Sequence, residues 1–296
     1  ITIPGLGEFR LKQPIPFLCS SQSFTISRTA DKWFVSFSLD VEKVPPVIHE
    51  VESVGIDLGI KTFATLSDGS TREAPSSLKK AKTKLNKQQW RNRKKQLGNR
   101  RKGIKASKNA KQYFGQLAKS HAYIANIRKD FLQKTTTEIS QKYYRIRIED
   151  LNISGMIANH KLSEAISSLG FYDFRRMLTY KEAFYGTKLE IVDRWFPSSK
   201  TCSSCGSVQP MPLSERVYKC GTCGHVQCRD LNAAINLNKA PFGKIRAVSS
   251  ALDGFPGLKR LRTRRASAES TPVDRKRAVS PGRSRKQTSK SLSYAT

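Results

Sequence analysis

Alternating apolar and polar residues predict strands at the start of the chain. The segments SFTISR (23–28) and KWFVSFSLDVE (32–42) both carry apolar side chains at about every second position, as strands buried on one face do. Residues 30–32 lie between them and have the length of a hairpin turn. Two prolines at 45–46 then mark a boundary, because proline interrupts regular structure. We therefore expect a β-hairpin and, after it, a new structural unit.

Further short apolar runs predict a buried sheet. Residues 53–60 (SVGIDLGI) read as a strand, and residues 63–67 (FATLS) follow before an Asp-Gly-Ser turn at 68–70, so these two runs are expected to pair as a hairpin. Residues 144–148 (YRIRI) alternate strictly and residues 189–193 (LEIVD) form a further apolar run. Both predict additional strands.

Helical periodicity covers most of the remaining chain up to residue 240. From 78 to about 141 the apolar residues recur at spacings of three and four, interrupted by two glycines near residue 100, and basic residues fill the opposite face. Residues 162–185 are helical again and end at Gly186, a residue typical of helix C-termini. An amphipathic stretch follows at 230–239. Strands interspersed with helices predict an α/β fold.

The charge of the chain is concentrated in two segments. The chain has 296 residues and a formal net charge of +31; residues 79–134 hold nineteen Lys and Arg against one acidic residue, and residues 239–296 hold fifteen against three. Such charge predicts a polyanionic partner. After Pro241 the composition is rich in Ser, Arg, Lys, Pro and Gly without periodicity, so we expect a disordered tail.

No apolar run approaches the length of a membrane span, and no signal peptide precedes the first strand. We therefore expect a soluble, cytoplasmic and prokaryotic protein, associated with the nucleoid, that has no membrane partner. Because the sequence begins at Ile1 within a strand-like region, we also expect a fragment or a truncated gene product.

Two CxxC pairs, fourteen residues apart, predict a zinc site. Tetrahedral zinc takes four thiolates at this spacing, and with no open position the metal is structural. Two disulfides are the alternative, which the lack of a signal peptide disfavours. Cys228 and His225 lie nearby and are either spare ligands or ordinary residues, and Cys19 resembles a core cysteine. The predicted ligands are Cys202, Cys205, Cys220 and Cys223.

Three carboxylates stand at the edges of predicted elements. Asp57 lies in the first strand of the sheet, Glu149 ends the YRIRI strand, and Asp230 opens the last helix. Phosphodiester nucleases need two or three carboxylates from different elements, because oxygen ligands must hold two Mg²⁺ ions. Taken singly, each has an ordinary explanation: a turn former, a solvated strand end and a helix N-cap.

Five motifs in order carry a resemblance to a known family. They are GIDLGIKTFATLSDG, RIEDLNISGM, RWFPSSKTCSSCG, YKCGTCGH and RDLNAAINL, and with the stretches between them they extend over roughly residues 1–240. The chain resembles the TnpB (OrfB) family of transposon-encoded proteins, relatives of the type V CRISPR effector nucleases. Members usually carry an N-terminal helical recognition region and a complete wedge-type barrel, which this sequence lacks, and commonly an Asp where this chain has Cys228.

The resemblance implies a fold and a division into domains. The fold is an RNase H-like (RuvC) mixed sheet with an inserted zinc ribbon, preceded by the remnant of a β-barrel and followed by the disordered basic tail. It also implies Asp57, Glu149 and Asp230 as the catalytic, Mg²⁺-binding triad. The expected parts are a wedge-type barrel remnant at 1–50, the RuvC-like domain at 51–195 with a basic helical insertion at 79–134, a nested zinc ribbon at 196–227, the last RuvC helix at 228–240 and the tail at 241–296.

The function implied is that of an RNA-guided DNA endonuclease associated with the transposase of an insertion sequence. It depends on structural Zn²⁺ and catalytic Mg²⁺, its partners are DNA and a guide RNA, and a separate transposase is encoded by the same element. The alternative is a catalytically silent nucleic-acid-binding accessory protein from a truncated copy; a guide-independent RuvC-like nuclease is a third hypothesis.

Smaller features of the sequence carry further expectations. The basic helical insertion is expected to contact phosphates, Tyr113 to pack in the core, and Trp90 either to pack or to stack on bases. Gly59 either brings the backbone close to the scissile phosphate or simply ends a strand. Asn232 and Asn236, one turn apart on the last helix, are expected to lie on its surface unless they contact backbone or metal-bound water.

Overall fold

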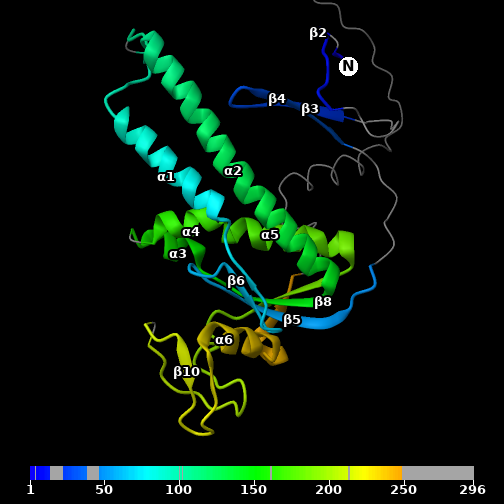
Figure 1. The fold of residues 1–296 in the computed structure, drawn as a ribbon. Coiled ribbons are helices and arrows are strands. Elements are labelled where there is room, and N and C mark those ends of the chain that lie inside the picture. Colours follow the sequence, from blue (N-terminus) through cyan, green and yellow to red (C-terminus); the bar gives the residue numbers. More distant parts are fainter. Residues whose placement is uncertain are drawn as a thin grey trace, which may run out of the picture. The chain divides into compact units, whose positions relative to one another are not determined.

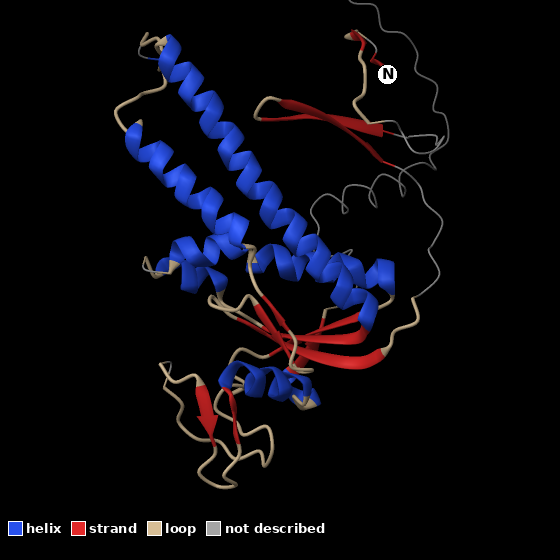
Figure 2. Cartoon of the chain, viewed as in Figure 1, coloured by secondary structure: helices blue, strands red, loops and turns tan. Residues whose placement is uncertain are grey.

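The chain was analysed as a computed structural model (Figures 1 and 2). It divides into two units, residues 1–251 and 252–296, and every described residue belongs to the first. The described residues are 1–3, 5–13, 23–38, 47–99, 101, 103–160, 162–212 and 214–248. The predictions for Cys19, for the prolines at 45–46 and for the tail beyond residue 248 therefore lie outside the described part.

The N-terminal residues form two separate hairpins. Strand β1 (Thr2–Ile3) pairs with β2 (Gly7–Glu8), and β3 (Ser23–Thr29) pairs in antiparallel register with β4 (Lys32–Ser38). Ala30, in the turn between β3 and β4, has a positive φ of 55°. The predicted hairpin is confirmed.

A mixed sheet brings together strands from residues 51 to 247. Within the described residues its strand order is β12-β9-β8-β5-β6-β7, where β5 is parallel to β8 and β8 to β9, and the outer pairs are antiparallel. The predicted hairpin of residues 53–67 is confirmed as β5–β6. The strands are β5 (Val51–Leu58), β6 (Ala64–Leu66), β7 (Thr71–Arg72), β8 (Tyr143–Glu149), β9 (Lys188–Val192) and β12 (Ile245–Ala247).

Helices cover one face of this sheet (Figure 1). Helices α2 (Lys108–Lys142) and α5 (Phe171–Tyr185) pack on it, α1 (Ser76–Arg91) pairs with α2, and the short α3 (Ile153–Ala158) and α4 (Ser163–Leu169) lie between β8 and α5 along the chain. The predicted helical region from 78 to 141 is confirmed as the α1–α2 pair. Tyr113 is buried, as expected, whereas Trp90 is 67% exposed.

One helix, α6 (Arg229–Asn238), covers the opposite face, beside the small hairpin of β10 (Val217–Lys219) and β11 (Val226–Cys228) (Figure 2). The alternation of the central strands separates the two faces. The side chains that pack toward α2 and α5 are Val54, Ile56, Ile146, Ile148, Leu189 and Ile191, together with Leu132, Ile139, Phe174 and Leu178 from the helices. The intervening residues of each strand face α6.

Two sequence predictions were wrong at their boundaries. The helix expected over residues 162–185 is divided into α4 and α5, because Gly170 has a φ of +75°, which a continuous helix does not allow. Glycine also fits this position because a Cβ there would lie 3.2 Å from side-chain atoms of Arg128 and Leu132. The unstructured tail does not begin at 241: a 3₁₀ turn, η2 (Phe242–Lys244), and strand β12 follow, and β12 extends the sheet by pairing with β9. Three-residue elements are too short to produce a periodic pattern.

None of the helices in the described part of the chain is long and apolar enough to cross a membrane.

Candidate functional site

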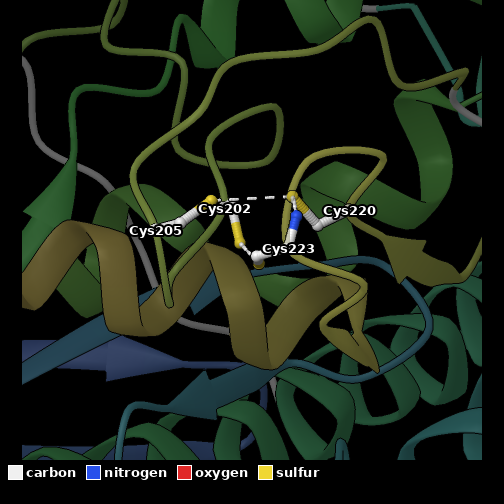
Figure 3. A group of neighbouring side chains, drawn as sticks. All are labelled: Cys202, Cys205, Cys220 and Cys223. Atoms are coloured by element: carbon white, nitrogen blue, oxygen red, sulfur yellow. Dashed lines mark hydrogen bonds between the residues drawn. The ribbon is translucent and has the colours of Figure 1, made fainter.

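The four cysteines of the two CxxC pairs form a compact cluster (Figure 3). Their Sγ atoms all lie within 4.8 Å of one another. The Sγ of Cys202 is 3.7 Å from that of Cys223, and the Sγ of Cys205 is 3.7 Å from that of Cys220. With Zn–S bonds of about 2.3 Å, the sulfur atoms of a tetrahedral site stand about 3.8 Å apart. The cluster therefore has the donor atoms and the spacing that could hold zinc.

Both CxxC pairs fold into the same turn. In each, the amide of the first cysteine donates to a carbonyl five residues later, at 2.8 Å, and the amide four residues later donates back to the cysteine at 2.9 or 3.0 Å. Gly206 and Gly224, at this fourth position, have φ angles of +76° and +73°. Glycine is favoured there because other residues adopt positive φ only with strain.

Hydrogen bonds favour the thiolate form of Cys220, whereas the neighbouring cysteines and burial raise the pKa of Cys223 to about 11. The Ser207 hydroxyl, 3.2 Å from the Cys220 sulfur, and the backbone amide of Cys223 lower the pKa of Cys220 to about 5. Thiolate is the form that binds metal. Cys228 and His225 lie outside the cluster; the His225 Nε2 is instead 3.2 Å from the Gln227 Oε1.

Asp57, Glu149 and Asp230 lie around one pocket. Asp57 lies two residues after Gly55 in β5, on the same face of the sheet, which is covered by α6. Glu149 is the last residue of β8, and Asp230 lies in the first turn of α6. All three line a pocket of about 790 Å³. Parallel strands bring their carboxyl ends to the same edge of a sheet, and α6 begins at this edge, so three elements deliver carboxylates to one place. The structure thus brings together all three carboxylates singled out in the sequence.

The environment of these carboxylates disfavours negative charge. Burial, followed by the neighbouring Asp230 and Glu149, raises the pKa of Asp57 to about 7, although the nearby Arg229 acts in the opposite direction. Burial and the adjacent Asp150 likewise raise the pKa of Glu149. Within the described residues no hydrogen bond or ion pair is found for the side chains of Asp57 and Glu149. A cation bound between them would relieve this repulsion.

The carboxylates are less tightly grouped than the cysteines. Among the residues that the structure describes, only the four cysteines form a set of three or more ligands within 4.8 Å of one another. The pocket therefore has the donor chemistry of a Mg²⁺ site, hard carboxylate oxygens, with wider spacing around a solvent-accessible space.

The side chains of Glu149 and its neighbour Asp150 differ in their hydrogen bonds. Asp150 accepts from Arg175 and from Arg194, both at 2.8 Å, and these arginines hold the pKa of Asp150 below its usual value, with Arg194 the stronger influence. Asp150 is thereby occupied in linking α5 to the loop after β9. Glu149 is the carboxylate of this pair that remains available in the pocket.

Basic side chains surround the carboxylates. The cations that line the pocket are Lys61, Arg194, Lys200, Arg216 and Arg229. The Arg216 Nη1 lies 3.9 Å from the Asp230 Oδ1, a long ion pair between an exposed arginine and a partly buried carboxylate. An anionic ligand with several oxygens, such as a phosphodiester, fits a pocket in which cations surround a central group of carboxylates.

Two glycines of the first strand motif have packing reasons that the sequence analysis did not establish. A Cβ on Gly55 would overlap the carbonyl oxygen of Ala234 and lie 2.5 Å from the amide nitrogen of Asn238, so α6 packs directly on the backbone of β5. A Cβ on Gly59 would lie 2.8 Å from the carbonyl oxygen of Thr62. The tight loop after β5 therefore requires glycine at position 59, next to the pocket.

Two asparagines on α6 are buried, contrary to the expectation that they lie on the helix surface. The Asn232 side chain accepts from the Ser203 amide at 2.9 Å and donates to the Thr201 carbonyl at 2.8 Å. Asn236 donates to the carbonyls of Ser198 and Thr201, at 2.8 and 2.6 Å. Both side chains therefore bind backbone groups, which was the alternative prediction from the sequence. They connect α6, the helix that carries Asp230, to the segment that leads into the cysteine cluster.

Comparison with known proteins places these features in a family. Residues 36–160 match the family model "OrfB_IS605: Probable transposase", and residues 171–237 match "Cas12f1-like, TNB domain". A protein of Streptomyces pristinaespiralis named "Putative RNA-guided DNA endonuclease" is 36% identical over 90% of this chain and 63% of its own length. The Escherichia coli K12 protein "Putative RNA-guided DNA endonuclease InsQ" is 31% identical over 86% of this chain and 65% of its own length.

A solved structure shows the same fold. The cryo-EM structure titled "Cas12f1-sgRNA-target DNA complex" superposes with a TM-score of 0.50 at 19% identity, covering 72% of this chain and 43% of that one. The fold is therefore mixed α/β and Cas12f-like. The chain belongs to the TnpB (OrfB) family of transposon-encoded proteins, and it spans a little under two thirds of the length of these two curated relatives.

Proposed function

We propose that this chain carries the catalytic site of an RNA-guided DNA endonuclease of the RuvC type. The observation that carries the proposal is the convergence of Asp57, Glu149 and Asp230 on one basic pocket. Each comes from a different element, which is the arrangement that a two-metal phosphodiester nuclease needs. The strand order, with an antiparallel hairpin beside parallel strands, supports an RNase H-like assignment of the sheet.

The three carboxylates would hold catalytic Mg²⁺. When bound, Mg²⁺ ions supply an activated water and stabilise the leaving oxygen of the scissile phosphodiester. The chain contributes the charge balance: Asp57, with a pKa of about 7, gives up its proton readily once a cation is present. Asp230 lies in the first turn of α6 and contributes its carboxylate to the same pocket.

The remaining side chains of the pocket would bind and orient the substrate. Lys61 and Lys200 add positive charge where a phosphate must approach the carboxylates, and Arg194 is held in place by its bond to Asp150. Because all three belong to loops at the edge of the sheet, they can contact a strand from more than one side. These contacts recognise phosphates and leave sequence choice to the guide RNA.

The α1 helix offers a second surface for nucleic acid. Its groove with α2, about 810 Å³ in volume, is lined by Lys79, Lys80, Lys84, Lys87 and Arg91, together with amides and hydroxyls. None of these five cations forms an ion pair within the described part of the chain. We name the side chains at 79, 83, 87 and 91 the α1 ridge; they recur every four residues, or about 6 Å along the helix, and would follow a phosphate backbone.

The cysteine cluster would hold a structural zinc ion, and the proposed domains follow from these assignments. They are a wedge-type part at 1–50, the RuvC-like domain at 51–195 with its insertion at 79–134, the zinc ribbon at 196–227 and the last RuvC helix at 228–240. The proposed partners are DNA, a guide RNA and a separate transposase of the same mobile element.

Cleavage assays with the full chain test this proposal. The chain is purified with the RNA that copurifies on expression beside its flanking DNA, and is given DNA that matches this RNA. We predict Mg²⁺-dependent cleavage that Asp57→Ala reduces at least a thousandfold, about 4 kcal/mol, while nucleic-acid binding persists.

Asp173→Asn is the matched control, because among the described residues the Asp173 carboxylate pairs only with its helix neighbour Arg176; this variant should cleave as the unaltered chain does. Absence of cleavage by the unaltered chain with its RNA would favour the silent accessory protein, and equal cleavage by Asp57→Ala would contradict the assignment of the triad.

A further inference from the structure

A large aromatic side chain lines the pocket, and most of its apolar surface is exposed to water. Trp195 is 82% exposed and lines the pocket together with Asp57, Glu149 and Asp230. Exposing an indole to water is unfavourable, since burying it would remove a large apolar area from solvent. An exposed aromatic beside a phosphate-binding pocket is therefore a candidate for contact with a ligand.

The position of Trp195 is set by the backbone around it. Its amide donates to the Asp193 Oδ1 at 2.8 Å, which closes the turn after β9. The amide of Asp193 in turn donates to the Lys244 carbonyl, also at 2.8 Å. The exposed ring therefore projects from a hydrogen-bonded turn, which reduces the entropy lost when a ligand binds to it.

The same wall of the pocket is connected to the helix that carries Asp230. Asn236 donates to the carbonyls of Ser198 and Thr201, a few residues beyond Trp195. Because Asn236 and Asp230 belong to the one helix α6, the wall and the carboxylate keep a constant separation. A nucleotide that contacts Trp195 is thus held at a defined distance from the carboxylates.

Trp195 differs from the other two tryptophans of the chain. The guanidinium of Arg28 lies over the Trp33 ring at 5.5 Å, and that of Arg93 over the Trp90 ring at 4.5 Å. Within the described residues no cation and no second aromatic ring stacks on Trp195. Both faces of its indole remain available to a flat partner.

We propose that Trp195 is a stacking platform for an unpaired base of the strand whose phosphate lies at the three carboxylates. The proposal rests on the proposed nuclease function and adds a residue that positions its substrate. In a duplex, each base already stacks on its neighbours and offers no free face, whereas every unpaired base does. The basic side chains Lys61 and Lys200 would hold the backbone of the same strand.

Binding measurements test the platform without any cleavage. The full chain with Asp57→Asn is titrated with a short oligothymidine, with an abasic strand of the same length, and with duplex DNA. We expect the oligothymidine to quench tryptophan fluorescence and Trp195→Phe to remove this quenching while keeping most of the affinity, since phenylalanine also stacks. Trp195→Ala should weaken oligothymidine binding by roughly five- to 150-fold and leave abasic-strand binding unchanged.

Trp33→Ala is the matched control, because Trp33 is exposed to 67% and lies outside the pocket lining; it should leave the preference for bases intact. An equal loss of abasic-strand binding in Trp195→Ala, or quenching that survives Trp195→Phe, would overturn the platform. Base-selective quenching by a chain that does not cleave would contradict only the nuclease proposal, and cleavage with unaltered binding by Trp195→Ala would contradict only the platform.

Discussion

Two carboxylates at the same edge of the sheet have pKa values shifted in opposite directions. Asp150 is neutralised by Arg175 and Arg194, which lower its pKa. Asp57 is partly buried beside two other acids, and its pKa rises to about 7. The second arrangement destabilises the folded protein at neutral pH, and a cation bound at the proposed Mg²⁺ site would relieve it.

The raised pKa makes a prediction about stability. Without Mg²⁺, folding favours protonated Asp57, so this contribution to the free energy of unfolding is complete below about pH 4 and is lost as the pH rises through 7. Asp57→Asn should therefore stabilise the Mg²⁺-free protein at pH 8, by an amount on the order of a few kcal/mol, and hardly at all at pH 4. Thermal unfolding across this range measures the difference.

Adding Mg²⁺ at pH 8 should stabilise the unaltered chain and have little effect on Asp57→Asn. The buffers contain no chelator, so that zinc at the proposed cysteine site is not removed. Equal melting temperatures for the two proteins at every pH would contradict the repulsion inferred here, and Asp173→Asn serves as the control for removal of an exposed carboxylate.

Single residues show where prediction from sequence succeeded and where it could not. The convergence of Asp57, Glu149 and Asp230 could be predicted, because strand ends and helix starts leave recognisable patterns in a family with ordered motifs. The packing of Gly55 against α6 and the burial of Asn232 could not, because both depend on which element lies opposite. A polar residue on a short helix looks the same in sequence whether water or a loop backbone receives its hydrogen bonds.

At the scale of elements, α6 joins the two metal-binding candidates. It packs on the backbone of β5 at Gly55, receives a hydrogen bond from the buried Arg147 at the Asn238 carbonyl, and contacts the cysteine segment through Asn232. Its amphipathic pattern predicted the helix correctly. The sequence did not predict that α6 connects the sheet to the cysteine segment, because this depends on which elements lie beside the helix.

The α1 ridge makes a prediction about salt dependence. Each phosphate contact releases counterions, so the logarithm of the binding constant falls with the logarithm of salt concentration, by about 0.7 per contact for a single strand. A variant with Lys79→Gln, Lys87→Gln and Arg91→Gln should therefore flatten this slope by about 2. Glutamine keeps the helix propensity of lysine and arginine, and fluorescence anisotropy at several salt concentrations gives the slope.

Three lysines of α2 provide a matched control. Lys108, Lys111 and Lys129 are exposed, lie outside the groove and form no ion pair within the described residues. Changing all three to glutamine removes the same charge and should alter the slope much less. If both triple variants flatten the slope equally, net charge rather than the ridge determines binding.

At the scale of the whole molecule, the sheet and the cysteine hairpin have separate cores. The sheet packs a large apolar cluster against α2 and α5, whereas the apolar cluster of the cysteine region contains, among the described residues, Met211 and Tyr218 beside two of the cysteines. So small a core is not expected to stabilise a fold alone, and a zinc ion at the proposed site would supply the missing free energy. The pocket combines both parts, because its carboxylates come from the sheet side and one wall comes from the approach to the cysteines.

Removal of zinc should therefore open the pocket without unfolding the sheet. Hydrogen exchange measured peptide by peptide after chelation should show lost protection across residues 194–228 and retained protection in β5, β8 and α2. Cys205→Ser should give the same pattern without chelation, whereas Cys228→Ser, at an exposed cysteine outside the cluster, should keep one zinc per chain. Metal analysis that finds no zinc in the purified protein would contradict the zinc site. Unchanged hydrogen-exchange protection after removal of zinc would contradict the prediction that the metal stabilises this wall of the pocket.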